Sequence, residues 1–364
     1  MSFRDHPARF DKAFLAGLFG RPATDLQDFA FTPVGTGQVG DSYRLSLDWA
    51  ASETVSESEN ESKNGAPLPG SLVAKCPAAD RVSRDTARSM HLYEIETQFY
   101  THFGDSCGAR VPHVFLSDYD AASGDGLLLF EDMAPAVQIA QMHGCSVPQL
   151  EAVLNEAARL HKSHWNDARL VEHMFLTYGH QEERRAFIGG LMPAVYPEWR
   201  ARYEGRLDKD ILDMGAALVA RFADYIAPRD GPMVLTHGDM RLDNMLFSDA
   251  DGRTILLDWQ TAAAGPPMGD IAYCISTSLA QADARAALEK QLVGAYHAKL
   301  GDSVGAYDFD AAWADYRRAS FAGFIMAVIS AMIVERTERG DEMFAVMAER
   351  SGWQALHLDA LALI

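Results

Sequence analysis

Residues 234–247 read VLTHGDMRLDNMLF, and residues 255–260 read ILLDWQ. Short apolar runs flank a polar loop that carries Asp239 and, five positions later, Asn244; the second stretch ends its apolar run at Asp258. Short apolar runs bounded by polar residues are typical of buried strands. The pattern therefore predicts a strand, a polar loop, and a hairpin whose second strand delivers another carboxylate.

These three side chains are of the types that phosphoryl transfer requires. Asp239 can accept a hydrogen bond from an attacking hydroxyl group, while Asn244 and Asp258 can supply oxygen ligands to Mg²⁺ that bridges nucleotide phosphates. Each type also has an ordinary structural role, an Asx turn for Asn244 and a helix cap for Asp239. Their combination with features that come earlier in the chain favours the catalytic interpretation.

A glycine motif, formed by Gly35, Gly37 and Gly40, separates an apolar run at 31–34 from the alternating residues 42–47. Dinucleotide folds and nucleotide-phosphate loops share this spacing, but a dinucleotide fold requires a helix at the third glycine. Here the residues after Gly40 predict a strand, so a hairpin turn over phosphates fits better than NAD binding. A plain glycine-rich turn is an equal alternative.

Lys75 ends a short apolar run, where an unpaired ammonium would be costly to bury. Glu94 and Glu96 lie on a predicted helix over residues 85–103, and because they are two positions apart they cannot both face the strand. Glu96 is favoured, since it lies four positions before Tyr100 on the apolar side. A lysine held by a helix glutamate can orient the phosphates of ATP.

From the glycine loop to the final helices, the sequence resembles the aminoglycoside and choline phosphotransferases. Within them it is most similar to the bacterial group of ecdysteroid kinase-like proteins. The most specific residues are His237-Gly238-Asp239 with Asn244, and Asp258 with the Trp-Gln that follows it. The resemblance implies an α+β, bilobal protein-kinase-like fold, with an N-terminal antiparallel sheet plus helix and a larger, mainly helical C-terminal lobe.

The same resemblance implies roles for residues. Asp239 would be the catalytic base, Asn244 and Asp258 would bind Mg²⁺, and Lys75 paired with Glu96 would bind ATP together with the glycine loop.

Two further segments receive roles from the resemblance. Residues 128–133, LLFEDM, would link the lobes, with the backbone of Glu131 and Met133 binding adenine. Asp270 would open a helix and steady the catalytic loop.

The predicted domains are a nucleotide-binding lobe at 1–132 and a helical lobe at 133–364 that holds the catalytic loop, 234–260, and substrate-binding helices. A Ser/Glu-rich stretch at about 50–71 is too polar to pack and predicts a flexible insertion. Six aromatic residues follow the helix near His161, and most are predicted to lie in the core while some face the acceptor site: Phe175, Tyr178, Phe187, Tyr196, Trp199 and Tyr203.

Composition excludes several classes of function. The chain has 364 residues, 48% of them apolar, and a formal net charge of -19, which disfavours nucleic acid as a partner. Its four cysteines form no CxxC pair, so neither disulfides nor a zinc site is expected. This use of cysteine predicts a cytoplasmic location. The apolar residues 321–334 are fewer than the ~18 that a membrane span needs. They predict a buried helix.

Other polar residues have structural interpretations. His161 and His164 are three positions apart on a predicted helix, but no third ligand has matching spacing, so packing beneath the catalytic loop is expected. Arg241 could touch phosphate or substrate, and pairing with a neighbouring carboxylate is the favoured interpretation.

The predicted function is an ATP-dependent, Mg²⁺-using small-molecule kinase with a hydroxyl acceptor. A hydroxylated lipid, sterol or hydroxyacyl compound is slightly favoured over an aminoglycoside or an amino alcohol. The alternative is a nucleotide-binding regulator or scaffold without turnover. A protein kinase is disfavoured because no long activation segment follows Asp258.

Overall fold

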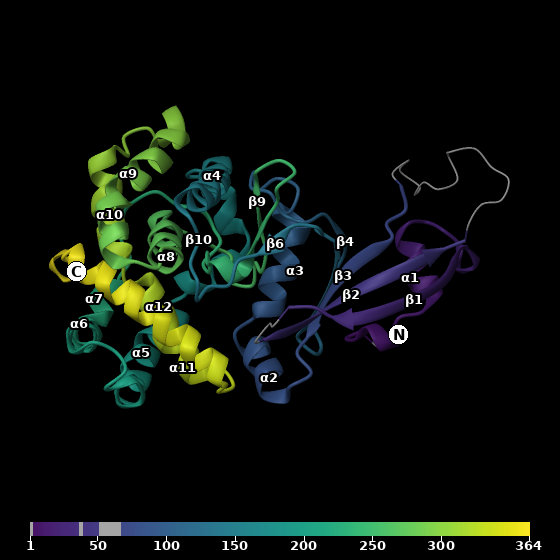
Figure 1. Ribbon diagram of the computed structural model, residues 1–364, viewed down its shortest axis with the longest axis horizontal. Coiled ribbons are helices and arrows are strands. Elements are labelled where there is room, and N and C mark those ends of the chain that lie inside the picture. The colour runs from purple at the N-terminus through teal and green to yellow at the C-terminus, as the bar shows by residue number, and fades with distance from the viewer. Residues whose placement is uncertain (1–2, 36–38, 51–66) are drawn as a thin grey trace. The chain divides into compact units, whose positions relative to one another are not determined.

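The computed structural model describes residues 3–35, 39–50 and 67–364, which fall into two compact units (Figure 1). Unit 1 comprises residues 1–105 and 112–134, and unit 2 comprises 106–111 and 135–364. Gly37 and most of the predicted insertion lie outside the described residues. The predicted fold class, with an antiparallel sheet in the N-terminal part and a mainly helical C-terminal part, is confirmed.

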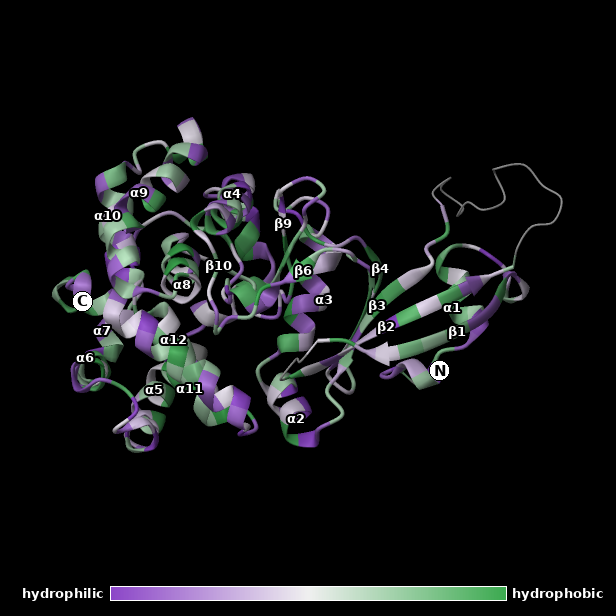
Figure 2. Cartoon of the chain, in the orientation of Figure 1, coloured by the Kyte–Doolittle hydropathy of each residue, from purple (hydrophilic) through white to green (hydrophobic). Residues whose placement is uncertain are grey.

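Unit 1 contains a five-stranded antiparallel sheet in the order β1-β2-β3-β5-β4. Its strands are β1 (Leu26–Pro33), β2 (Gly40–Trp49), β3 (Ser71–Pro77), β4 (Val114–Asp120) and β5 (Asp125–Glu131). Along β2, Tyr43, Leu45 and Leu47 are buried while the residues between them are exposed. This alternation, visible as colour bands in Figure 2, places every second side chain in the core.

The helices of unit 1 differ from the prediction at one point. They are α1 (Lys12–Leu18), α2 (Arg81–Ser89) and α3 (Leu92–Phe103), with 3₁₀ turns at Pro7–Arg9 and Ala23–Asp25. The single helix predicted over 85–103 is therefore wrong. It is interrupted at His91, whose φ of 60° is left-handed and ends an α-helix. No glycine or proline marks this break in the sequence.

Unit 2 is built from nine α-helices over its described residues, all of which lie in 106–111 and 135–364. They are α4 (Val147–Ser163), α5 (Glu182–Tyr203), α6 (Lys209–Ala220), α7 (Phe222–Ile226), α8 (Met268–Ser278), α9 (Ala282–Leu300), α10 (Phe309–Ala319), α11 (Ala322–Ile333) and α12 (Glu338–His357). The 3₁₀ turns are Ala168–Glu172, Met174–Leu176, Tyr178–His180, Leu242–Asn244, Gly301–Val304 and Ala360–Leu363.

Two small sheets complete unit 2. Strands β6 (Val137–Gln138), β8 (Met245–Phe247) and β9 (Thr254–Leu256) form one of them, and β7 (Val234–Thr236) pairs with β10 (Ala263–Gly265) in the other. The predicted strands on either side of the polar loop are thus present as β7, β8 and β9.

The core of unit 2 lies among α5, α6, α11 and α12, with Trp199 and Phe324 buried in it. The apolar residues predicted as a buried helix form α11, in which Phe324, Ala327 and Val328 are buried. In the described part of the chain, one stretch, Phe309–Ile333, is long and apolar enough to cross a membrane by composition, and 44% of its most apolar window is buried. Ser320 separates α10 from α11 within that stretch.

Candidate active site

The polar loop of unit 2 begins where β7 ends and turns sharply at Gly238. This glycine has a φ of 81°, and a Cβ at its position would lie 2.4 Å from the carbonyl oxygen of Thr261. Any larger residue would therefore be strained and would clash with backbone. The Thr261 hydroxyl also donates to the His237 carbonyl at 2.8 Å, so the turn is held against the chain that follows β9.

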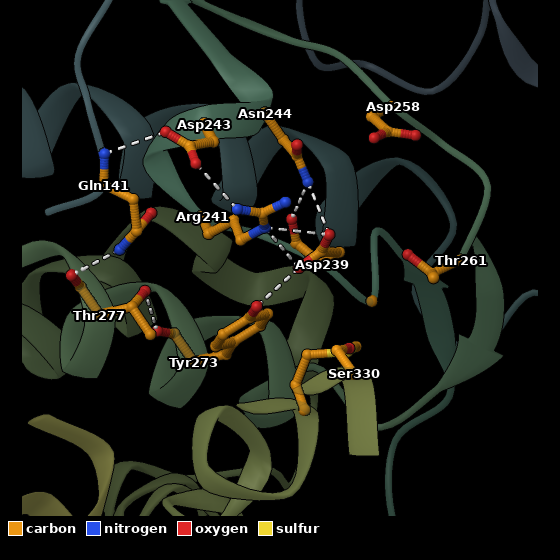
Figure 3. Close-up of polar contacts among 12 residues, drawn as sticks. Gln141, Asp239, Arg241, Asp243, Asn244, Asp258, Thr261, Tyr273, Thr277 and Ser330 are labelled. Carbon is orange, nitrogen blue, oxygen red and sulfur yellow. Dashed lines mark hydrogen bonds and ion pairs between the residues drawn. The ribbon is translucent and has the colours of Figure 1, made fainter. Parts of the chain in front are cut away.

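Asp239 follows this turn and is only 8% exposed. Its carboxylate accepts hydrogen bonds from the Tyr273 hydroxyl at 2.6 Å, the Asn244 amide at 2.8 Å and Arg241 Nε at 3.2 Å (Figure 3). A carboxylate offers about four acceptor positions. Arg241 Nε also lies 3.2 Å from the second carboxylate oxygen, so each of the two oxygens has contacts from two donors and the carboxylate is fixed in place.

The protonation state of Asp239 follows from these neighbours. Burial raises the pKa of Asp239, but the Arg241 guanidinium and the hydrogen bonds from Tyr273 and Asn244 outweigh burial, and the net pKa is lowered. Burial raises the pKa of Tyr273 well above its usual value, so its hydroxyl keeps the proton it donates. Asp239 is therefore an ionised hydrogen-bond acceptor at neutral pH rather than a strong base.

Helix α8 holds the loop through two residues three positions apart, which share one helix face. The Asp270 carboxylate accepts from the backbone N–H groups of His237 at 2.7 Å and Gly238 at 2.8 Å, and Tyr273 contacts Asp239. Burial raises the pKa of Asp270, but the hydrogen bond from His161 and the nearby His237 lower it overall. As predicted, Asp270 lies in the first turn of a helix, and its carboxylate holds the polar loop in place.

His161 has the structural role that the sequence predicts. It is fully buried on α4, with Nε2 3.2 Å from Asp270 and Nδ1 2.6 Å from the Tyr296 hydroxyl. His164 ends α4, and its Nδ1 lies 2.7 Å from the Ser163 hydroxyl. Among the described residues, no three His, Cys, Asp or Glu side chains are grouped so that they could hold a metal ion.

Asn244 and Asp258 offer oxygen atoms in the same region. The amide nitrogen of Asn244 donates to the carbonyl and carboxylate of Asp239, which leaves its amide oxygen for another contact. Asp258 follows β9 with a φ of 65°, and its carboxylate accepts from Gln260 at 3.3 Å. Left-handed aspartates are uncommon and are found at functional sites. In Figure 3 the Asp258 carboxylate lies apart from the hydrogen bonds around Asp239.

Arg241 pairs with carboxylates, as favoured from the sequence. Its Nε contacts Asp239 and its Nη1 donates to Asp243 at 3.1 Å. The neighbouring acids raise the pKa of Arg241 despite its burial, so the side chain remains a cation between two anions.

Four of the six aromatic residues considered for the core are buried. Phe175, Tyr196, Trp199 and Tyr203 are buried, Tyr178 is half-buried, and Phe187 is 55% exposed.

The predicted nucleotide-binding residues of unit 1 surround β3. Lys75 lies opposite Ser42 of β2 and Leu128 of β5, and its Nζ is 2.7 Å from Glu96 on α3. The Glu96 side chain is 3% exposed, so the ion pair is nearly buried. The pairing of Lys75 with Glu96 is confirmed. Glu94 contacts His91 instead, at 3.0 Å.

Two glycines of the loop have structural reasons to be glycine. Gly35 has a φ of 77°, which favours a residue without a side chain. A Cβ on Gly40 would lie 3.3 Å from the Cys76 carbonyl and 3.6 Å from Lys75 Cε, so Gly40 allows β2 to pass close to the lysine.

The predicted adenine-binding segment lies where unit 1 ends. The Glu131 N–H donates to the His113 carbonyl at 2.8 Å. The backbone of Glu131 could therefore contact adenine through its carbonyl oxygen. Between Glu131 and the half-buried Met133, the Asp132 carboxylate is held by Arg44 of β2 at 2.8 and 3.1 Å. Sequence reasoning missed this Arg44 pair because 88 positions separate its members.

Tyr273 is a second residue that sequence reasoning missed. Its spacing of three from Asp270 on a predicted helix was the signal that could have identified it.

Comparison with known proteins identifies similar sequences and similar folds. The sequence profile of the ecdysteroid kinase-like family matches residues 43–308. An ethanolamine kinase from Plasmodium vivax has a similar structure, with a TM-score of 0.53, 11% identity, and coverage of 93% of this chain and 87% of that one. The gentamicin complex of APH(2")-IIa has a TM-score of 0.51 and 13% identity, with coverage of 95% and 99%. These likenesses confirm the predicted kinase-like fold.

A curated relative matches a shorter segment. Acyl-CoA dehydrogenase family member 11 from Gallus gallus is 34% identical over 76 residues, which is 21% of this chain and 10% of that protein. The similarity thus spans about a tenth of the relative's length.

Proposed function

The chain belongs to the ecdysteroid kinase-like family of phosphotransferases, and from this premise we propose that it transfers the γ-phosphoryl group of ATP to a hydroxyl group of a small molecule. The observation that carries the proposal is the Asp239 carboxylate, which is ionised and is held in place by three donors from the loop and from α8. Asn244 and Asp258 follow Asp239 along the chain, as the two metal-binding residues of protein kinases follow their catalytic Asp.

In this proposal the acceptor hydroxyl donates its hydrogen bond to Asp239, which orients the oxygen toward the γ-phosphorus. The new O–P bond forms as the bond to the bridging oxygen of ADP breaks, and the hydroxyl proton passes to Asp239. The lowered pKa of Asp239 suits this role, because in a loose transition state the hydroxyl proton is transferred late and the rate depends mainly on the position of the hydroxyl group. No covalent intermediate with the protein is formed.

The residues of unit 1 would bind the nucleotide. Lys75, oriented by Glu96, would contact the α- and β-phosphates, and the backbone at Gly35 and Gly40 would face the phosphates. The Glu131 carbonyl and the Met133 N–H would bind adenine.

The oxygen donors of unit 2 fit Mg²⁺. The Asn244 amide oxygen and the Asp258 carboxylate are hard ligands, and Mg²⁺ needs few of them when substrate phosphates supply the others. When bound, the ion would neutralise charge on the triphosphate.

The acceptor that we propose is apolar, a hydroxylated lipid, sterol or hydroxyacyl compound rather than an aminoglycoside. Helix α11 packs on α8 beside Tyr273, so closely that a Cβ on Gly323 would lie 3.0 Å from the tyrosine ring. On α11, Ile325, Met326 and Ile329 are only partly buried, which leaves apolar surface on this helix. The name of the matched relative, an acyl-CoA dehydrogenase, adds support for an acyl-linked acceptor.

Transfer of labelled γ-phosphate from Mg-ATP into fractionated small-molecule extracts tests the proposal. We expect a labelled product in an apolar fraction, and Asp239→Asn should reduce its rate by about 100-fold or more. Asp249→Asn, an exposed aspartate in the turn after β8, is the matched control and should keep the wild-type rate. ATP binding without a product in any fraction would instead support the regulator without turnover.

A further inference from the structure

The segment that precedes α4, residues 137–145, runs beside the catalytic loop and is here named the strap. It begins with β6, which pairs with β8 so that Val137 lies opposite Phe247 and Gln138 opposite Leu246. The side chain of Gln138 also donates to the Asp243 carbonyl. The strap is therefore attached to the loop at its first residues, about 100 positions before the loop in the sequence.

The central residue of the strap is Gln141, which is 1% exposed. Its Oε1 accepts from the Leu242 N–H at 2.8 Å, and its Nε2 donates to the Thr277 carbonyl at 2.7 Å. Its own N–H donates to the Asp243 carboxylate at 3.0 Å (Figure 3). A buried amide is tolerated when both of its ends are bonded. Here the two ends join the catalytic loop to helix α8.

The strap also covers the C-terminus of α8, where the last carbonyl groups lack partners within the helix. Besides Gln141, the Thr277 carbonyl accepts from Arg350 at 2.8 Å, and the Ser278 carbonyl accepts from the Cys145 N–H at 2.8 Å. A Cβ on Gly144 would lie 2.7 Å from the Ser278 carbonyl, so the strap passes in direct contact with the helix end.

Arg350 of α12 holds the strap in this position. It is 8% exposed, and beyond Thr277 it donates to the carbonyls of Gln141 at 2.9 Å and Met142 at 2.7 Å. A cation at a helix C-terminus is favourable, because the exposed carbonyls carry partial negative charge. Gln141 thus presents its amide to the loop from a backbone that is itself fixed.

We propose that Gln141 is a positioning residue for the catalytic loop, an inference that rests on the proposed function. Its bonds fix Leu242 and Asp243, Asp243 holds Arg241, and Arg241 holds Asp239. The series of contacts in Figure 3 leads from the strap to the carboxylate that accepts the hydroxyl group. Because a misplacement of ~1 Å can cost a catalytic site about 100-fold in rate, loss of Gln141 should act on turnover.

The test compares Gln141→Met with a matched variant, Gln354→Met. Gln354 is also fully buried in unit 2, and it donates to Glu289 and Tyr316, away from the loop. With the acceptor identified by labelling, Gln141→Met should lower kcat by about 10- to 100-fold and change the KM for ATP by less than about twofold. Gln354→Met should lower stability without this loss of kcat.

Amide hydrogen exchange gives a second measurement that needs no substrate. In Gln141→Met the Leu242 amide should exchange at least about tenfold faster than in the wild type, whereas Gln354→Met should leave it protected. Gln141→Glu keeps an oxygen for the Leu242 N–H, so it should protect that amide better than Gln141→Met does. This variant also serves if the methionine variant does not fold.

Two results would overturn the proposal. One is an unchanged kcat and unchanged Leu242 exchange in Gln141→Met; the other is an equal loss of kcat in Gln354→Met. If the wild-type protein transfers phosphate to no acceptor, the proposed function fails, and the exchange of Leu242 still decides whether Gln141 holds the loop.

Discussion

Lys75 in unit 1 and Asp239 in unit 2 are positioned in different ways. Lys75 owes its place to the register of β3 between β2 and β5, and the Glu96 carboxylate from α3 orients it. Asp239 lies on a short loop, and its place depends on side chains from α8 and from the loop itself. A sheet positions a residue through backbone bonds, whereas a loop needs side chains from distant segments to hold it.

This contrast predicts that a substitution near the loop of unit 2 will lower both stability and activity, whereas a substitution at Lys75 in unit 1 will have a local effect. The largest effect on stability is expected for Asp270→Asn, which puts an amide where two backbone N–H groups and His161 are bonded. The free energy of unfolding should fall by about 3 kcal/mol in urea titrations, and kcat should fall with it. Asp283 is an exposed residue in the first turn of α9, and Asp283→Asn should change the free energy of unfolding by less than about 0.5 kcal/mol.

At acid pH, the difference in the free energy of unfolding between the wild type and Asp270→Asn should become smaller. The pKa of Asp270 is lowered in the folded protein, so its charge contributes stability above its unfolded pKa of about 3.9, and that contribution is lost as pH falls through the folded value. Unfolding measured from pH 7 down to pH 3 should show a constant difference at first and a smaller one at the acid end. A difference that grew toward acid would contradict the lowered pKa.

In unit 1 the contrast predicts a local defect that a second substitution repairs. Lys75→Met leaves the buried Glu96 without its cation, and the free energy of unfolding should fall by about 2 kcal/mol. Adding Glu96→Gln should recover much of that stability but none of the affinity for ATP. Calorimetric titration with ATP beside urea unfolding separates the two effects, and recovery of ATP affinity in the double variant would refute the nucleotide role of Lys75.

Tyr273→Phe tests the loop with a smaller change, the loss of one hydroxyl. Because the Tyr273 hydrogen bond helps to lower the pKa of Asp239, its removal should raise that pKa. The acid limb of kcat should move to higher pH, and kcat at pH 7 should fall by about tenfold. A pH–rate profile from pH 4 to 8 measures both. An unshifted acid limb would show that the hydroxyl does not set the charge of Asp239.

The smallest effect is expected at the break between α2 and α3. His91→Gly removes a side chain from a left-handed position and should raise the free energy of unfolding by about 0.5 kcal/mol. Loss of the contact between His91 and Glu94 should offset part of this gain. His102→Gly, in the last turn of α3, should lower it instead, because glycine is unfavourable inside a helix. Thermal unfolding of the two variants is the comparison.

Much of the site could be predicted because its residues are close in sequence or lie on regular elements. Asp239, Asn244 and Asp258 lie within one loop and hairpin, and Glu96 follows from helical spacing. The break at His91 could not be predicted, since no glycine or proline marks it and no local pattern places this histidine in the left-handed conformation.

The sequence by itself determined the strands on either side of the loop and the change from a strand-rich to a helix-rich part, because these depend on local patterns of apolar and polar residues. The kinase-like class of the fold followed from the resemblance of the motifs around Asp239 and Asp258 to a known family. Only the tertiary structure decided that Gln141, Tyr273 and Arg350 serve the same loop. Such contacts join segments up to 209 positions apart, and they form where buried polar groups must find partners once water is excluded. No local pattern specifies which partner each of them finds.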